Sequence, residues 1–437
     1  MDRSGAPSVA AEIGQPVGEQ ACPSCGAPIP VLRGYSPWCD ACDWNLAPTE
    51  APQKTSSKRD QLLERTAGRL SEGRFEAIRR RSADKPGFSI AQALIFAVSI
   101  IVLALTLFLL IAGIWLLLNG PGFVGPIVGV ILIGIAIVLR PRFGSMPPSV
   151  TRQDASELFG VPDAVAASIG VRPADRIAIT SDFNAAVTEI GLRRQRVLFL
   201  GLPLMAVLSP QERVAVLGHE FGHYANGDPL RGTVPSLAIE TLIGWYQLLR
   251  PEGIASSPDG DAFHGLVLIP VNVVLLVLSH IPVALAYAIY WLTAQDGQRA
   301  EFYADRLAVR LSGRDAFVSA WTKMHLGRTV AAWTRASTDE HWLNQSLWEE
   351  LEARVAGFPE RELDRARRLE LVQKARIDAT HPPTYLRIRL AEEVGPENGS
   401  IEISEQASAD FDAILRRAAP EVQQALIDQH TSSLYAS

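Results

Sequence analysis

Long runs of apolar residues separate the more polar parts of the chain. Residues 89–118 contain no charged side chain, and a second apolar run covers residues 123–139 after the turn Asn119-Gly120-Pro121-Gly122. A helix needs about 20 apolar residues to cross a bilayer. The two runs therefore predict a transmembrane hairpin over residues 89–140. A buried hairpin of a soluble core is the alternative, and runs of this length argue against it.

Two further apolar runs follow later in the chain. Residues 233–249 form a short run that includes Glu240, whereas residues 265–294 are free of Asp, Glu, Lys and Arg but contain Pro270, His280 and Pro282. We expect a second transmembrane hairpin over residues 233–294, and a re-entrant fold of the longer run at its prolines stays open. Glu240 and His280 would then lie in the membrane, where ionisable groups often mark a functional cavity. A plain helix contact is the simpler explanation of His280.

Between the two hairpins the pattern is that of a folded polar domain. Ser209-Pro210-Gln211-Glu212 reads as an N-cap, a proline at the first helical position and a capping-box glutamate. Apolar residues 214–217 follow, and Asn226-Gly227-Asp228-Pro229 supplies stop signals. The sequence therefore predicts a helix that begins near Pro210 and ends near Asn226.

Composition and charge add compartment and orientation. The 437 residues are 48% hydrophobic and 20% charged with a net charge of −6, which gives no argument for nucleic-acid binding. We expect no cleavable signal peptide, because no apolar stretch follows a basic start. Residues 54–86 hold ten Lys or Arg against five Asp or Glu, and residues 250–263 hold one Arg against three acids. The positive-inside rule then predicts a cytoplasmic N-terminus, and the latter loop suits the outside.

All four cysteines lie near the start of the chain, in two C-x-x-C pairs. Such pairs at this separation bring four thiolates within reach of one tetrahedral zinc ion, so we expect a zinc ribbon with one structural zinc. Two disulfides are the alternative, which a cytoplasmic segment disfavours. Tyr35, Trp38 and Trp44 could face a partner, but in so small a domain they are expected to cover its core. The four predicted ligands are Cys22, Cys25, Cys39 and Cys42.

The predicted helix near Pro210 carries the sequence H-E-x-x-H. His219 and His223 lie four residues apart and share one helix face, so both imidazoles can reach one metal ion. Two histidines and a third protein ligand leave a coordination position for water, as in a catalytic zinc site. Glu220 could then take the proton of a zinc-activated water as general base. A chance match in an ordinary helix is the alternative reading.

A third zinc ligand is expected on a second helix. Glu301 and Asp305 are also four residues apart, so Glu301 could bind the metal while Asp305 accepts the N–H of a ligating histidine. A solvated acidic pair is the alternative meaning of this spacing. Because His223 and Glu301 must meet on one side, the chain between them crosses the membrane an even number of times.

These motifs resemble the HtpX-like membrane zinc metallopeptidases, a family that includes the Ste-type CaaX endopeptidases. The resemblance covers residues 184–390 and includes Asn184-Ala185-Ala186-Val187, residues 201–209, the H-E-x-x-H helix, residues 301–305, and Thr380-His381-Pro382-Pro383 with Arg387. It implies zinc ligands His219, His223 and Glu301, with Glu220 as base. It also implies an edge strand at Asn184 that pairs with peptide substrate, and roles for His381 and Arg387 in oxyanion stabilisation or substrate positioning. Read without the resemblance, Asn184 suits a turn residue, His381 suits a histidine at the start of a helix, and Arg387 suits a solvated arginine.

The sequence thus predicts a mainly α, α+β polytopic membrane protein with a zincin-like (gluzincin) domain. We expect a zinc metalloendopeptidase of the inner or plasma membrane with a cytoplasmic site, one catalytic and one structural zinc, and polypeptide substrates including misfolded membrane proteins. The alternatives are an antibiotic-sensor type signalling metallopeptidase, a CaaX-type processing protease, and a non-catalytic membrane scaffold. The expected order is ribbon 1–46, basic linker 47–88, hairpin 89–140, peptidase part 150–232, hairpin 233–294, peptidase part 295–395 and helical tail 396–437.

Overall fold

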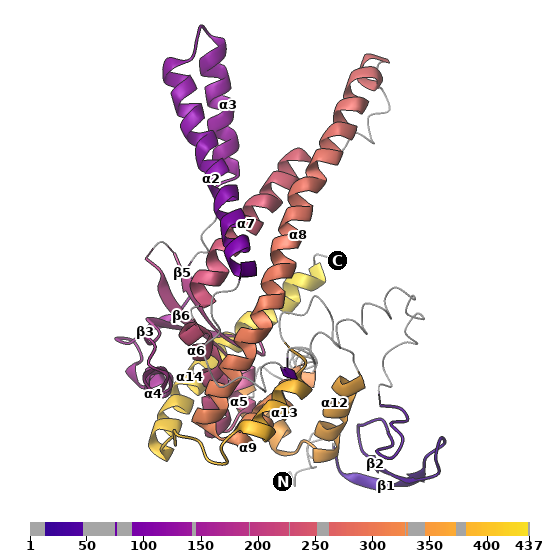
Figure 1. The fold of residues 1–437 in the computed structure, drawn as a ribbon. Coiled ribbons are helices and arrows are strands. Elements are labelled where there is room, and N and C mark those ends of the chain that lie inside the picture. The colour runs from indigo at the N-terminus through magenta and orange to yellow at the C-terminus, as the bar shows by residue number, and fades with distance from the viewer. Residues whose placement is uncertain are drawn as a thin grey trace, which may run out of the picture. The chain divides into compact units, whose positions relative to one another are not determined.

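The computed structural model describes residues 14–46, 75–76, 90–141, 146–191, 193–226, 228–250, 262–327, 329–330, 346–372 and 382–435. Over these residues the chain is mostly helical with a few strands, and it divides into two compact units (Figure 1). The first unit holds Met1–Asp84, Met146–Asn226 and Glu301–Ser437. The second holds Lys85–Ser145 and Gly227–Ala300.

The second unit is built from apolar helices. It contains α2 (Ile90–Asn119), α3 (Val124–Val138), α7 (Asp228–Leu249) and most of α8 (Ala262–Ser312), which continues into the first unit. In α2 and α3 glycines allow close packing, since a Cβ on Gly129 would lie 2.7 Å from the carbonyl oxygen of Gly113. A small core joins α2, α7 and α8 through Ile95, Val102, Ala238, Leu242, Ala286 and Ile289.

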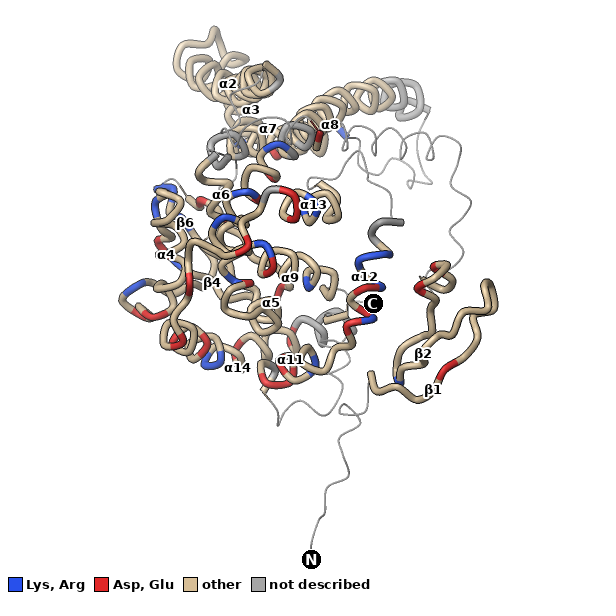
Figure 2. The backbone as a smooth tube through the Cα atoms, turned by 60° about the horizontal axis from the view of Figure 1, so that its bottom comes forward, with Lys and Arg blue, Asp and Glu red and all other residues tan. Residues whose placement is uncertain are grey.

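Two helices of the described residues are long and apolar enough to cross a membrane, Gln92–Asn119 and Val271–Thr293. Val124–Val138 is apolar but shorter, and Figure 2 shows no charged residue along α2 and α3. The run 233–249 lies within α7. This helix is not one of the two candidate membrane helices, so a membrane crossing by residues 233–249 stays a prediction. The re-entrant alternative is wrong, because α8 passes Pro270 and Pro282 as one continuous helix.

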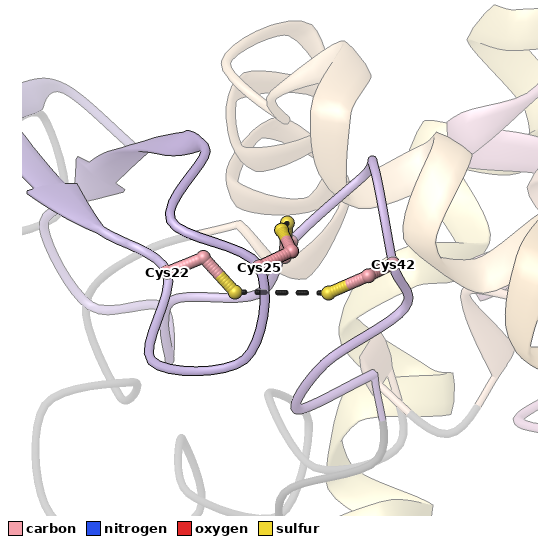
Figure 3. Close-up of side chains that lie close together, drawn as sticks. Cys22, Cys25 and Cys42 are labelled. Carbon is pink, nitrogen blue, oxygen red and sulfur yellow. Dashed lines mark hydrogen bonds between the residues drawn. The ribbon is translucent and has the colours of Figure 1, made fainter.

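The N-terminal part of the first unit is a small β-hairpin with two cysteine turns. β1 (Pro16–Ala21) pairs antiparallel with β2 (Pro28–Leu32). The turn after Cys22 closes when the N–H of Gly26 donates to the carbonyl of Cys22 over 2.9 Å, with Gly26 at a φ of 78° that favours glycine. Figure 3 shows the thiols of Cys22 and Cys42 facing each other from the two turns.

The rest of the first unit is organised around a four-stranded sheet of order β3-β4-β6-β5. β4 and β6 run parallel and the other pairs antiparallel, so the β5–β6 hairpin lies at one edge. Within the described residues β5 pairs only with β6, which leaves its outer side as a sheet edge. The strands are β3 (Val150–Thr151), β4 (Arg176–Thr180), β5 (Ala185–Ile190) and β6 (Gln195–Gly201).

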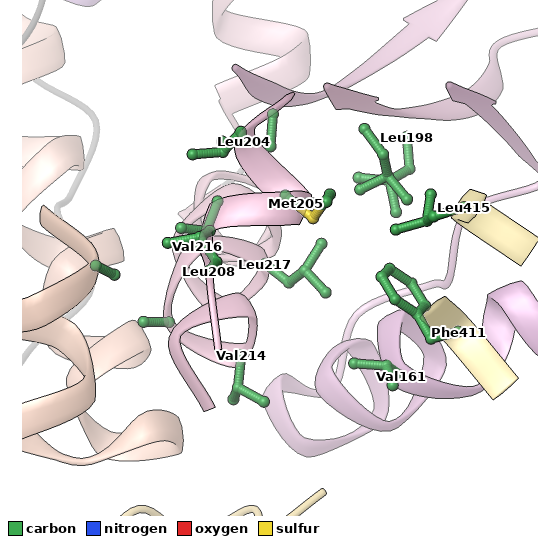
Figure 4. Packing of buried hydrophobic residues seen from close by; sticks show 14 of the residues in the cluster. Val161, Leu198, Leu204, Met205, Leu208, Val214, Val216, Leu217, Phe411 and Leu415 are labelled. Carbon is green, nitrogen blue, oxygen red and sulfur yellow. The ribbon is translucent and has the colours of Figure 1, made fainter. Parts of the chain in front are cut away.

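Helices pack on this sheet and enclose the main hydrophobic core. Figure 4 shows Leu198 of β6, Leu217 of α6 and Phe411 of α14 directed into one shared space. These three side chains come from the sheet face and from the apolar faces of two helices, and all three are buried, as expected for amphipathic elements. The helices are η2 (Ser156–Phe159), α4 (Gly160–Ile169), α5 (Leu202–Val207), α6 (Pro210–Asn226), α9 (Arg314–Met324), α11 (Leu347–Ala356), α12 (Glu360–Val372), α13 (Thr384–Val394) and α14 (Glu405–Tyr435).

Several sequence predictions fall outside the described residues. They include most of the linker 47–88, the loop 251–261 and His381. Within the linker, Phe75 is described and fully buried against Phe302, Leu386 and Leu390 of the first unit. The linker therefore has at least one apolar anchor on α8 and α13.

Candidate metal centre and active site

The helix α6 that carries H-E-x-x-H begins at a capping box. The N–H of Ser209 donates to Oε2 of Glu212 over 2.6 Å, and the N–H of Glu212 donates to the Ser209 hydroxyl over 3.4 Å. The Glu212 carboxylate also accepts from Lys323 of α9 over 2.8 Å. These bonds fix both the start of α6 and its contact with α9, which defines the position of each later turn.

Two glycines let α6 approach α8 closely. A Cβ on Gly222 would lie 2.9 Å from Cα of Ala304, and a Cβ on Gly218 would lie 3.1 Å from Cα of Ala308. Both pairs are spaced by four residues, so small residues meet along one face of each helix. The helix backbones are therefore near enough for Glu301, one turn before this contact, to reach the two histidines of α6.

The donor atoms of three residues converge on one point. Nε2 of His219 lies 3.2 Å from Nε2 of His223 and 3.4 Å from Oε2 of Glu301, and Nε2 of His223 lies 3.5 Å from Oε1 of Glu301. These three residues form a group that could hold a metal ion, as one donor atom from each lies within 4.8 Å of the others. His219 and Glu301 are buried and His223 is half-buried.

The spacing of these donors fits zinc. Ligands at about 2.0–2.1 Å in a tetrahedral site are about 3.3–3.4 Å apart, close to the three distances found here. Two imidazole nitrogens with one carboxylate are also a ligand set that zinc accepts in catalytic sites. Three protein ligands would leave the fourth coordination position for water or substrate.

Asp305 and Arg387 hold His219 from behind. Nδ1 of His219 lies 2.9 Å from Oδ1 of Asp305, so Nε2 is the nitrogen directed to Glu301 and His223. Arg387 donates from Nε to Oδ2 of Asp305 over 2.8 Å and from Nη2 to Oδ1 over 2.6 Å. This two-point contact fixes the carboxylate, and the carboxylate fixes the tautomer of His219.

The charges in this buried group stabilise one another. Burial alone would raise the pKa of Asp305, but Arg387 and His219 lower it, so the carboxylate stays ionised. Burial and Arg387 lower the pKa of His219, whereas its contacts with Asp305 and Glu301 outweigh them and raise it to about 9. A proton and a metal ion therefore compete for the His219 ring.

Trp321 of α9 closes the site behind the ligands. Its ring stands edge-on to the His219 ring, with centroids 5.3 Å apart, and the Arg387 guanidinium lies 4.7 Å from its centroid. Phe317 stacks on the other side of the indole at 4.0 Å. The ring limits the rotation of both polar side chains and keeps water from this side of the site.

The remaining predicted site residues occupy different positions. Glu220 is half-buried on α6 beside His219, and its charge adds to the field that keeps Arg387 protonated. Asn184 is exposed immediately before the edge strand β5, where its carbonyl accepts from Gly201 over 2.8 Å. Arg387 is buried and bound to Asp305, which gives it a positioning role; contact with substrate stays a prediction. His381 lies outside the described residues.

The four cysteines form a second group that could hold a metal ion. They are free, with Sγ atoms 3.7 Å apart for Cys22 and Cys42 and 3.6 Å apart for Cys25 and Cys39. A disulfide would bring sulfurs to about 2.05 Å. Sulfurs bound to zinc at about 2.3 Å lie about 3.8 Å apart in a tetrahedron, which these distances approach.

Sequence reasoning did not identify Gly218, Gly222 or Trp321 as parts of the site. The glycines had a visible signal, because glycine inside a helix costs about 1 kcal/mol relative to alanine and usually reflects close packing. Trp321 had no local signal. It lies about 100 residues beyond His219 in the sequence, and only the folded chain brings them together.

An H-E-x-x-H helix whose histidines meet a glutamate of a second helix is the arrangement of zincin-type metallopeptidases. The model of peptidase family M48 matches residues 154–394, which include both helices. This chain belongs to peptidase family M48.

Curated relatives agree with this family. The chain is 25% identical over 211 residues to the protease HtpX of Aliivibrio salmonicida, covering 47% of this chain and 71% of the relative. It is 24% identical over 278 residues to an HtpX homologue of Archaeoglobus fulgidus, covering 62% and 77%. A third match, to the homologue of Pyrobaculum calidifontis, is 23% identical over 260 residues and covers 53% and 72%.

Proposed function

We propose that this protein is a membrane-bound, zinc-dependent endopeptidase. The observation that carries the proposal is the triangle formed by one donor atom each of His219, His223 and Glu301, all within 4.8 Å of one another. The two Nε2 atoms are 3.2 Å apart, and Oε2 and Oε1 of Glu301 lie 3.4 Å from His219 and 3.5 Å from His223. The group that fits this triangle is zinc, which acts as a Lewis acid toward water and a peptide carbonyl when bound. The other roles belong to side chains of the chain itself.

Glu220 is the proton carrier of the proposed reaction. It follows the ligand His219 on α6 and is half-buried. We assign it the removal of a proton from the attacking water and the delivery of that proton to the nitrogen of the leaving amine. The products are then a new carboxylate and a new amino terminus, with atoms and protons balanced by the water consumed.

The edge strand β5 is the proposed substrate platform. Its outer side is not paired with any described strand, so an extended peptide can add to the sheet through backbone hydrogen bonds. Gly201 of β6 supports the start of this strand, since a Cβ there would lie 2.4 Å from the carbonyl oxygen of Asn184. We assign Asn184 to substrate binding, and we retain His381 as a proposed oxyanion donor.

The proposed location is the inner or plasma membrane, with the active site in the cytoplasm. The apolar helices Gln92–Asn119 and Val271–Thr293 support membrane attachment. The basic residues before the first helix support the orientation. Polypeptides, including misfolded membrane proteins, are the proposed substrates.

Replacement of Glu220 tests the proposed chemistry. Glu220→Gln should lower the hydrolysis of an unfolded, casein-like substrate by about 10²–10⁴-fold, because a general base is lost. Bound zinc, measured in the same sample, should be unchanged because Glu220 is not a ligand. Glu402→Gln is the matched control, since Glu402 is exposed outside the site. Wild-type turnover in Glu220→Gln would contradict the proposal.

A further inference from the structure

One face of α12 is lined with arginines that contact the cysteine-containing hairpin, here called the ribbon (residues 14–46). Arg361, Arg365 and Arg368 are spaced by four and three residues, so they lie on the same side of the helix. Each of them donates to the ribbon. Arg361 reaches the carbonyl of Trp38, Arg365 reaches those of Ser36, Asn45 and Leu46, and Arg368 reaches that of Asp40.

Aromatic and acidic side chains complete this contact. Trp38 is 1% exposed, its Nε1 donates to Glu362 of α12 over 3.2 Å, and its ring lies 4.5 Å from the Arg361 guanidinium. Tyr35 meets Phe358, just before α12, edge to face at 5.8 Å. Trp38 and Tyr35 therefore face the peptidase part of the same chain. The sequence had predicted instead that they cover the ribbon's own core.

The arginines recognise a backbone shape of the ribbon. Their five carbonyl acceptors lie at residues 36–46, around the cysteine pair Cys39 and Cys42. This segment also holds Asp43 and Asn45 at φ of 57° and 59°, a region that residues other than glycine rarely adopt. Carbonyls converge on α12 only while the segment keeps this conformation.

Among the described residues, the ribbon's own apolar core is small. Its buried cluster consists of Cys22, Ile29 and Cys39, and two of these three are predicted metal ligands. Domains of this size with so small a core are usually folded by their metal. Loss of the metal would therefore remove the surface that α12 binds.

The other side of α12 contacts the wall of the active site. Nε of Arg367 donates to the hydroxyl of Thr322 on α9 over 2.9 Å. The neighbouring residue is Trp321, whose ring lies against His219 and Arg387. A ribbon bound to α12 is therefore linked through Arg367 to α9, the helix whose Trp321 packs against the ligand His219.

We propose that the ribbon is a metal-dependent clamp: with metal in its four-cysteine site it docks on the arginine face of α12 and holds α12 against α9, and without metal it releases. The docking does not depend on peptidase activity. The consequence for catalysis rests on the proposed function, so the test measures docking directly.

Hydrogen–deuterium exchange of the full chain in detergent micelles tests the clamp. The variant Cys25→Ser/Cys42→Ser removes two exposed thiols and should lose the ribbon metal. We expect amides of α12 to exchange roughly tenfold faster or more, with a smaller increase in α9 and none in α4, which lies apart from this contact. Zinc analysis of the same samples should show one zinc fewer per chain than in the wild type.

An arginine variant separates docking from metal binding. Arg365→Ala should keep the zinc content of the wild type and still deprotect both α12 and residues 36–46, because three carbonyl contacts are lost. Arg417→Ala, an exposed arginine of α14, is the matched control and should change neither. Unchanged α12 protection after loss of the ribbon metal would overturn the clamp. Unchanged protection in Arg365→Ala would overturn the assigned role of the arginines.

Discussion

At the scale of single residues, the site depends on how His219 is held. Its Nδ1 faces Asp305, which is fully buried and bound at two points by Arg387. A ligand fixed in this way presents Nε2 without rotating or changing tautomer. The buried guanidinium of Arg387 binds Asp305, and its Nη2 also lies 3.2 Å from Nε2 of His219 and 3.5 Å from Oε2 of Glu301. The expected contact of Arg387 with substrate stays a prediction. An arginine that carries a positive charge into the interior needs such a partner.

Asp305→Asn should weaken zinc binding by about 10–100-fold, since an amide cannot hold the His219 tautomer as a carboxylate does. It should also leave Arg387 buried without its partner charge. Competition with a chromophoric chelator measures the affinity. Asp410→Asn, on the surface of α14, should leave the affinity unchanged. Equal affinities of the wild type and Asp305→Asn would remove Asp305 from the metal centre.

At the scale of elements, the sequence predicted what is encoded locally. The cap at Ser209, the apolar residues 214–217 and the stop after Asn226 define α6, which spans Pro210–Asn226. The approach of α6 to α8 was not predicted, because it depends on Gly222 meeting Ala304 across about 80 residues of sequence. The binding of the ribbon to α12 was not predicted either, since its acceptors are backbone carbonyls and carry no residue signature.

Gly222→Ala tests the contact between α6 and α8. The new Cβ would lie 2.9 Å from Cα of Ala304, a backbone atom that cannot move alone. Overpacking costs about 1–3 kcal/mol, and the higher helix propensity of alanine offsets about 1 kcal/mol of it. We expect a lower melting temperature and weaker zinc binding, because Glu301 is displaced from the histidines.

Gly160→Ala is the control for this change. Gly160 begins α4, and a Cβ there meets no atom within 4 Å. It should leave both zinc affinity and stability nearly unchanged. Wild-type zinc affinity in Gly222→Ala would show that the close approach is not what brings Glu301 to the site.

At the scale of the whole molecule, apolar helices and a polar peptidase part alternate along one chain. The peptidase part is interrupted between Asn226 and Glu301, and residues from both sides of the interruption supply the metal ligands. In a chain that spans a membrane, the site can form only if the chain leaves and returns on the same side. Hydropathy identifies the apolar helices, but the predicted crossing by residues 233–249 depends on neighbours that hydropathy does not describe.

Sidedness can be measured with single added cysteines and an impermeant thiol reagent on intact cells. Ser256→Cys lies in the acidic segment 250–263 and should be labelled from outside. Ser168→Cys, exposed on α4 of the peptidase part, should be labelled only after lysis. The parent chain gives the background from its own four cysteines. Labelling of Ser168→Cys in intact cells would place the active site outside.

The most direct test of the central claim is restoration of activity by metal. The purified full chain is stripped with a chelator, zinc is added back in steps, and bound zinc and hydrolysis of an unfolded protein are measured in the same samples. We predict no hydrolysis in the stripped protein, and hydrolysis that returns as the site of His219, His223 and Glu301 fills. Glu301→Gln should regain the zinc of the four-cysteine site but little of the second zinc and little hydrolysis, because it lacks the third ligand charge. Hydrolysis by the metal-free wild type, or full recovery in Glu301→Gln, would contradict the account.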